Sequence, residues 1–122
     1  MAIREGFHTV TPYLTAPDAD TLVEFMKRGL GGTETHRSTG GQGGFHIEVK
    51  IGDSMIMVGQ RAGAPTTAML FLYVDDVDAW HSRALEAGAT SIMPPADAAD
   101  GDRRGSVRDA CGSVWFFGKP KG

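Results

Sequence analysis

Residues Thr11–Asp20 read TPYLTAPDAD, and residues Met69–Asp78 read MLFLYVDDVD. Each stretch is a β-prone apolar run that leads into an Asp able to cap a helix. A shift of 58 residues (71 − 13) places Phe71 on Tyr13. The same shift aligns three identities, which are Leu14 with Leu72, Asp18 with Asp76 and Asp20 with Asp78. The chain therefore reads as two copies of one structural unit.

The sequence that follows the first stretch predicts one helix and three more strands. Helical spacing of Leu22, Phe25, Met26 and Leu30 predicts a helix that starts at 17–20 and ends at 31–32. Residues 45–51 alternate, with Phe45, Ile47, Val49 and Ile51 on one face and His46, Glu48 and Lys50 on the other. The first unit is thus strand 9–15, the helix, strand 33–37, a Gly-rich turn at 38–44, strand 45–51 and strand 54–59.

The second stretch repeats this order. Its elements are strand 69–74, a helix opened by 75–76 and ended by Gly88, strand 89–93, a polar loop at 94–101, strand 104–108 and strand 113–118. Each unit is too small to bury its own sheet face, so the two should pack together. We predict an α+β fold in which 1–122 form one domain, with βαβββ repeats at 9–60 and 68–118.

Composition excludes several classes of protein. The chain has 122 residues, 41% of them hydrophobic, and a net charge of −3 with acids and bases well mixed, which does not resemble a nucleic-acid-binding surface. No apolar run approaches the roughly 20 residues that a membrane helix needs, and the N-terminus lacks an apolar signal core. The one cysteine, Cys111, cannot form an internal disulfide, so we predict a cytoplasmic protein.

Four phrases of this sequence resemble the glyoxalase, bleomycin-resistance and extradiol-dioxygenase group of the vicinal oxygen chelate superfamily. They are TPYLTAPD at 11–18, YVDDVD at 73–78, AGA at 87–89 and DRRGSVRD at 102–109. A fifth, HIEVKIGDSMIM at 46–57, resembles the PhnB-like branch of that group. The resemblance implies two βαβββ units whose sheets curl around a cavity, usually in a homodimer. It does not imply a substrate, because this fold hosts many activities.

The resemblance also implies where a divalent metal would be held. Carried over by motif, the ligand positions are Thr11, Met57, Met69 and Phe116. None of these side chains is a good donor for a hard cation, so no metal or other cofactor is predicted. His46 and Glu48 share one face of a strand and leave a metal site open as an alternative, although catalytic metals typically need three protein ligands.

The same register implies an apolar cavity lining. Its members are Thr11, Tyr13, Met55, Met57, Met69, Phe71, Tyr73 and Phe116. Such a lining suits a small hydrophobic or aromatic ligand, with His46 and Glu48 at the polar end and Arg103 as a candidate contact for an anionic group. The alternative is that the apolar side chains fill the core and that Arg103 pairs with Asp97, Asp100 or Asp102.

Three functions follow from these observations. The first is metal-independent binding of a small hydrophobic or aromatic molecule, as in antibiotic resistance by sequestration. The second is a metal-dependent lyase, isomerase or dioxygenase that uses His46 and Glu48. The third is a structural dimer with a filled cavity. The sequence does not decide whether the protein is an enzyme, and it does not name the ligand.

Overall fold

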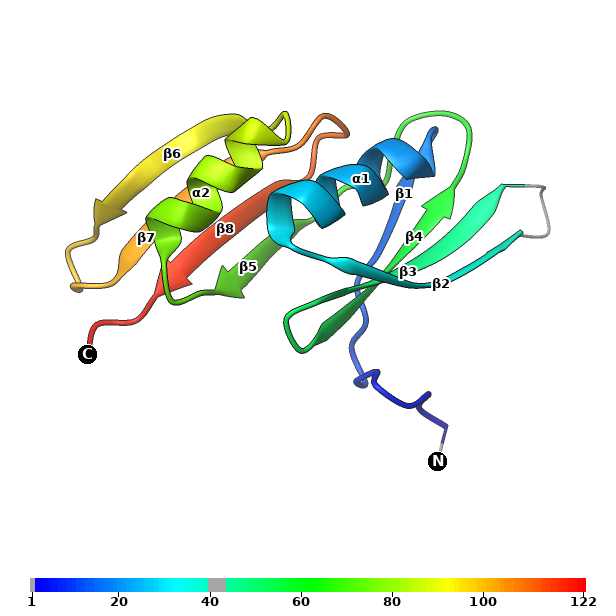
Figure 1. The fold of residues 1–122 in the computed structure, drawn as a ribbon, viewed down its shortest axis with the longest axis horizontal. Coiled ribbons are helices and arrows are strands. Elements are labelled where there is room, and N and C mark those ends of the chain that lie inside the picture. The colour runs from blue at the N-terminus through cyan, green and yellow to red at the C-terminus, as the bar shows by residue number, and fades with distance from the viewer. Residues whose placement is uncertain (1, 40–43) are drawn as a thin grey trace.

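The computed structural model describes residues 2–39 and 44–122, and most of the Gly-rich turn predicted at 38–44 lies outside them. The first half contains β1 (Tyr13–Ala16), α1 (Ala19–Leu30), β2 (Thr33–Thr39), β3 (Phe45–Ile51) and β4 (Ser54–Gln60). The second contains β5 (Met69–Tyr73), α2 (Val77–Glu86), β6 (Thr90–Asp97), β7 (Arg103–Arg108) and β8 (Val114–Lys119). The predicted α+β fold of two βαβββ repeats is confirmed (Figure 1).

Each half forms its own four-stranded mixed sheet. The strand orders are β1-β4-β3-β2 and β5-β8-β7-β6. The first strand of each half pairs in parallel with the last strand of that half, and the remaining pairs are antiparallel. Because the topology is the same in both halves, residues at equivalent places in the two repeats occupy equivalent places in the two sheets.

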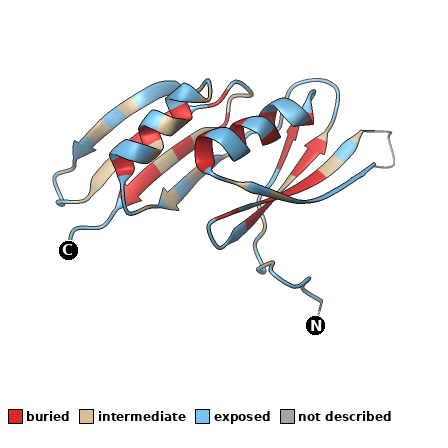
Figure 2. Ribbon diagram, in the orientation of Figure 1, coloured by how far each residue is buried: buried red, intermediate tan, exposed pale blue. Residues whose placement is uncertain are grey.

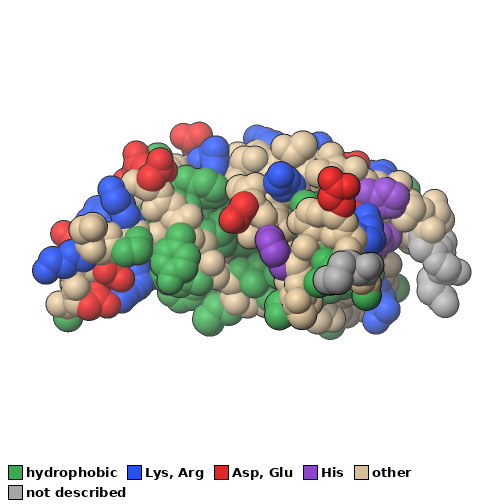
Figure 3. Space-filling view, turned by 90° about the horizontal axis from the view of Figure 1, so that it is seen from below, with side chains coloured by type: hydrophobic (Ala, Val, Ile, Leu, Met, Phe, Trp, Pro, Cys, Tyr) green, Lys and Arg blue, Asp and Glu red, His purple; other side chains and the backbone are tan. Residues whose placement is uncertain are grey.

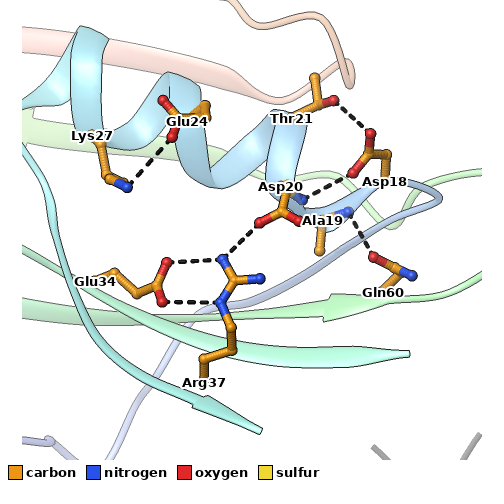
Figure 4. Close-up of polar contacts among 9 residues, drawn as sticks. All are labelled: Asp18, Ala19, Asp20, Thr21, Glu24, Lys27, Glu34, Arg37 and Gln60. Carbon is orange, nitrogen blue, oxygen red and sulfur yellow. Dashed lines mark hydrogen bonds and ion pairs between the residues drawn. The ribbon is translucent and has the colours of Figure 1, made fainter. Parts of the chain in front are cut away.

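The ends of α1 lie where the Asp and Gly residues predicted them. The Asp18 carboxylate accepts hydrogen bonds from the backbone N–H of Asp20 and the hydroxyl of Thr21, both at 3.1 Å (Figure 4). Gly31 ends the helix in the left-handed region at φ +67°, which a residue without a Cβ adopts easily. In the second half, Asp76 caps α2 through the backbone N–H of Ala79 at 3.0 Å.

The core lies between the helices and the sheets. Both helices cover the same side of the two sheets, which lie side by side (Figure 1), and the buried residues concentrate under the helices (Figure 2). Ile47, Val49 and Ile51 are buried on the helix side of β3, as the alternation predicts. Phe25 of α1 lies 6.3 Å from Trp115 of β8 between ring centroids, so the two halves share one core.

β6 differs from the prediction, which ended this strand at 93 and placed a loop at 94–101. In the structure β6 extends to Asp97 and includes Pro94 and Pro95. Proline removes a ladder hydrogen bond and is tolerated mainly on edge strands. β6 is the edge strand of its sheet, and its register with β7 shifts between Met93 and Ala96. The sequence around the prolines does not show that the strand lies at an edge.

Among the described residues, neither helix combines the length and the apolar character needed to cross a membrane.

Candidate functional site

Most of the predicted ligand-binding residues divide between the open faces of the two sheets, which are the faces turned away from the helices. Tyr13 and Met57 are paired in the β1–β4 ladder, and Phe71 and Phe116 are paired in the β5–β8 ladder. These two pairs are equivalent in the repeat. His46 and Glu48 lie on the first face, and Met69 lies on the second. The structure therefore forms two groups where the sequence predicted a single lining.

A chain of polar contacts crosses the open face of the first sheet. Arg4 donates from Nη1 and Nη2 to the two carboxylate oxygens of Glu48, each at 2.7 Å. His46 Nε2 lies 3.1 Å from Glu48 Oε2, and the Tyr13 hydroxyl lies 3.3 Å from His46 Nδ1. We call Arg4, Glu48, His46 and Tyr13 the Glu48 cluster. The cluster contains the positive charge of Arg4, the carboxylate of Glu48 and two side chains, His46 and Tyr13, that can donate or accept protons.

Glu48 is the buried member of this cluster. Its side chain is 1% exposed, whereas that of Arg4 is 59% exposed. The hydrogen bonds from Arg4 hold the pKa of Glu48 below its ordinary value, with a smaller contribution from His46, even though burial acts in the opposite direction. The carboxylate is thus stabilised in its charged form.

Arg4 is the member of the Glu48 cluster that the sequence did not reveal. It belongs to the segment 2–12, which contains neither helix nor strand, and it is 44 residues away from Glu48. The one available signal is indirect: a carboxylate on a buried strand needs a partner. The alternation at 45–51 places only His46 and Lys50 on the same strand face as Glu48, so these were the partners that the sequence suggested. His46 does contact Glu48, whereas Lys50 is exposed.

The side chains at the metal positions that the resemblance implies are poor ligands for a divalent cation. Thr11 lies before β1 and donates its hydroxyl to the His8 carbonyl at 3.1 Å. Met57, Met69 and Phe116 offer thioethers and a phenyl ring, which are not ligands for hard cations. In residues 2–39 and 44–122, no three His, Cys, Asp or Glu side chains are grouped as a metal site. Both oxygens of Glu48 are already engaged by Arg4.

A cavity of about 570 Å³ lies between the two sheets. Its lining comes from the β3–β4 turn, from β5 and from two tryptophans. The residues are Pro12, Ile51–Ser54, Ile56, Leu70–Val74, Trp80 and Trp115. Of the residues predicted to line the cavity, Phe71 and Tyr73 belong to this lining. The prediction missed the tryptophans because they lie on a helix and on the helix side of β8.

An exposed aromatic surface adjoins this cavity along β5. Met69 is 70% exposed, Phe71 48% and Tyr73 77%, so these side chains do not fill the core of this chain. The Phe71 ring stacks on Phe116 with 6.1 Å between centroids and lies 5.1 Å from the Tyr73 ring. A Cβ added at Gly118 would overlap the Phe71 ring, so this ring lies close over the backbone of β8. We call Met69, Phe71, Tyr73 and Phe116 the β5 aromatic surface.

The distribution of side-chain types over the molecule matches this division. From below, the hydrophobic side chains gather mainly over the half that contains β5–β8, whereas histidines appear over the β1–β4 half (Figure 3). The β5 aromatic surface and the Glu48 cluster therefore belong to different repeats.

Arg103 lies apart from the other predicted ligand-binding residues. It donates to both Asp78 oxygens at 3.0 and 2.9 Å and to Asp97 at 3.0 Å. Asp97 was among the partners considered from the sequence, whereas Asp78 comes from α2 and was not. The neighbouring Arg104 pairs with Asp100 at 2.6 Å. In this structure the guanidinium of Arg103 is thus occupied by carboxylates of the chain itself.

The Glu48 cluster predicts a specific loss of stability in acid. A carboxyl group with a lowered pKa in the fold stabilises the protein above its unfolded pKa, about 4.3. This stabilisation disappears as the pH falls through the folded value. We expect Glu48→Gln to be less stable than wild type at pH 7, and the difference to shrink below about pH 4.3. The urea unfolding midpoints of wild type and Glu48→Gln at pH 7 and pH 3 measure this difference.

The matched control for this experiment is Glu86→Gln, an exposed carboxylate of α2. It should leave the urea midpoint nearly unchanged at both pH values. A constant difference between wild type and Glu48→Gln across the whole pH range would contradict the expected role of the Arg4 pair.

Comparisons with known proteins agree with the fold and the repeat. A family model described as the Glyoxalase/Bleomycin resistance protein/Dioxygenase superfamily matches residues 6–117. The uncharacterized protein Rv0887c of Mycobacterium tuberculosis (strain ATCC 25618 / H37Rv) is 31% identical over 125 residues, covering 91% of this chain and 74% of its own. The uncharacterized protein Mb0911c of Mycobacterium bovis is also 31% identical, with 91% and 82% covered.

Solved structures of other proteins share this fold. The crystal structure of TioX from Micromonospora sp. ML1 superposes with a TM-score of 0.75 at 27% identity, covering 94% of this chain and 98% of that one. Lactoylglutathione lyase from Agrobacterium tumefaciens superposes with a TM-score of 0.70 at 20% identity, with 92% of both chains covered. The second similarity concerns the fold alone.

Proposed function

The chain belongs to the Glyoxalase/Bleomycin resistance protein/Dioxygenase superfamily, and from this we propose that it binds a small hydrophobic or aromatic molecule without a metal. The observation that carries the proposal is the apolar cavity of about 570 Å³, whose size lies in the usual range for small-molecule sites. Phe71 and Tyr73 line this cavity and also belong to the exposed β5 aromatic surface. A planar ligand could therefore stack against rings that are already in place.

Two observations favour binding over metal-dependent catalysis. Three of the four metal positions that the resemblance implies lack a hard donor and the fourth offers only the Thr11 hydroxyl, and the alternative pair, His46 and Glu48, has its carboxylate bound by Arg4. A metal-dependent lyase, isomerase or dioxygenase would need that carboxylate free and a third ligand. Sequestration of an aromatic antibiotic is one form that metal-free binding can take, so such compounds belong in the first screen.

The proposed working form is a homodimer in the cytoplasm. Single exposed apolar residues are common, but a contiguous patch such as the β5 aromatic surface usually marks an interaction site, and β5 is also an edge strand. We expect sedimentation equilibrium to give twice the chain mass of 13.0 kDa, and a 13.0 kDa species at high concentration would contradict this. The cytoplasm is proposed because the only cysteine is a free thiol.

Ligand binding is tested by a thermal-shift screen of planar antibiotics and metabolites in buffer with EDTA. A ligand at 100 times its dissociation constant should stabilise wild type by about 2.7 kcal/mol. We expect Phe71→Ala to weaken the best hit about tenfold, or about 1.4 kcal/mol, because the ring forms part of the cavity wall. Isothermal titration calorimetry measures the affinities.

Leu85→Ala is the matched control, since it shortens a partly exposed apolar side chain of α2 outside the cavity lining. It should bind the hit as wild type does. If no compound stabilises wild type, or if Phe71→Ala binds equally well, the cavity is not the binding site. Binding that disappears in EDTA and returns with added metal would favour the metal-dependent alternative.

A further inference from the structure

We propose that the Glu48 carboxylate is the docking point for a planar organic cation, and that Arg4 occupies this point until such a ligand displaces it. This goes beyond the proposed function, because the cavity and the β5 aromatic surface provide apolar contacts, whereas this site lies on the open face of the β1–β4 sheet. It predicts that the ligand is a cation and that Arg4 of the N-terminal segment controls access to the carboxylate.

The first argument is the asymmetry of the ion pair. The Glu48 side chain is 1% exposed and that of Arg4 is 59% exposed. With Arg4 in place the carboxylate is thus covered from solvent, while the guanidinium that covers it remains largely exposed. A buried carboxylate requires a positive partner, but nothing in this geometry requires that the partner come from the chain itself.

The second argument is the loose attachment of Arg4. In the described part of the chain, the hydrogen bonds that join residues 2–11 to the sheets come from Arg4 alone. The other hydrogen bonds of this segment are internal, from Phe7 N–H to the Arg4 carbonyl and from the Thr11 hydroxyl to the His8 carbonyl. The Arg4 guanidinium also lies over the Phe7 ring at 4.7 Å. Release of Arg4 would thus disturb no strand or helix.

The third argument is the chemistry around Glu48. Arg4 uses two N–H groups for the two carboxylate oxygens, and an amidinium or guanidinium group on a ligand can reproduce this geometry. Met57 is the neighbour of both Glu48 and Tyr13 in the sheet register. A thioether and a phenol ring beside the carboxylate favour a flat cationic body. Because loss of Arg4 alone would leave Glu48 unpaired, the ligand should enter in exchange for Arg4.

The test uses three isosteric probes at pH 8, which are cationic 2-naphthamidine, neutral 2-naphthamide and anionic 2-naphthoate. Calorimetry on wild type and Arg4→Gln compares their affinities. If Arg4 occupies the site nine-tenths of the time, its removal should strengthen 2-naphthamidine binding about tenfold. Binding of 2-naphthamide should change less than about twofold, since a neutral group does not compete for the carboxylate.

Three further variants control this result. Glu48→Gln should remove the preference for 2-naphthamidine over 2-naphthamide. Arg37→Gln should change nothing, because Arg37 pairs with Asp20 and Glu34 on the helix side of the same sheet (Figure 4). If Arg4→Gln does not fold, Arg4→Lys keeps the charge but loses the two-pronged geometry, and it should bind 2-naphthamidine more tightly than wild type does while it binds 2-naphthamide equally well.

Displacement of Arg4 has its own signature in the wild-type protein. Saturation with 2-naphthamidine should lower the heteronuclear NOE of the Gly6 and Phe7 amides, whereas 2-naphthamide should leave it unchanged. An unchanged NOE, or Arg4→Gln affinities at or below those of wild type, would overturn the proposal. Equal affinity for the cation and the amide in every variant would overturn it while leaving the proposed function intact. Failure of all three probes to bind would also overturn the proposal that a cation docks at Glu48. The proposed function is tested separately, by the thermal-shift screen.

Discussion

Replacing Trp115 with alanine is expected to lower the free energy of unfolding by about 3–5 kcal/mol, as is typical for removal of a large buried aromatic ring. Trp115 is 0% exposed, packs against Phe25 of α1 and forms part of the cavity wall between the two sheets. The loss is a large fraction of the roughly 5–15 kcal/mol that stabilises a domain. Urea denaturation followed by circular dichroism measures it.

Two other variants show what the ring of Trp115 contributes. Trp115→Phe keeps an aromatic ring in the core and should lose less stability than Trp115→Ala. Trp80→Ala removes a half-buried tryptophan of α2 that also lines the cavity, and its loss should be smaller because less apolar surface returns to water. A loss below about 1.5 kcal/mol for Trp115→Ala would mean that the core between the halves is not packed as the structure shows.

Replacing Asp109 with alanine is the second change with a large expected effect, about 3 kcal/mol. Asp109 is buried at the β7–β8 turn, where its Oδ1 accepts from the backbone N–H groups of Cys111 at 2.8 Å and Ser113 at 3.2 Å. Its Oδ2 accepts from the indole N–H of Trp115 at 2.7 Å. Alanine would leave three donors without this acceptor, and unsatisfied buried donors are costly.

Asp109→Asn is the matched control, because its side-chain oxygen can still accept from the turn while its amide group cannot accept from the Trp115 indole. It should lose less stability than Asp109→Ala. Combining Asp109→Ala with Trp115→Phe in a double-mutant cycle isolates the indole contact. If the two changes add independently, the hydrogen bond between Asp109 and Trp115 contributes nothing to stability.

These two residues connect stability with the proposed function. Asp109 fixes the orientation of the Trp115 indole, and Trp115 forms part of the cavity between the sheets. We therefore expect the shape of the cavity to depend on the packing of these buried residues rather than on exposed residues at its opening. The Arg4–Glu48 pair lies on the opposite face of the first sheet from the helices, so changes there should leave the cavity intact.

The sequence alone determined the elements of the fold and their order. The capping residues Asp18 and Asp76 and the alternation at Phe45–Ile51 each express a short-range rule, and the 58-residue repeat shows the same local pattern twice. Such rules act between residues that are close in the chain, so they are visible in the sequence. They correctly assigned Ile47 and Val49 to the core and His46 and Glu48 to the other face of the strand.

Only the tertiary structure decided which distant residues meet. Arg4 and Glu48 are 44 residues apart, and Arg103 and Asp78 are 25 apart. The residues predicted to line one pocket are divided between two sheets, and of these only Phe71 and Tyr73 line the cavity between them. Strand periodicity specifies the face on which a side chain lies, but not the distance between two sheets or the path of a segment without regular structure. Those depend on how the helices pack in the shared core, which no local pattern encodes.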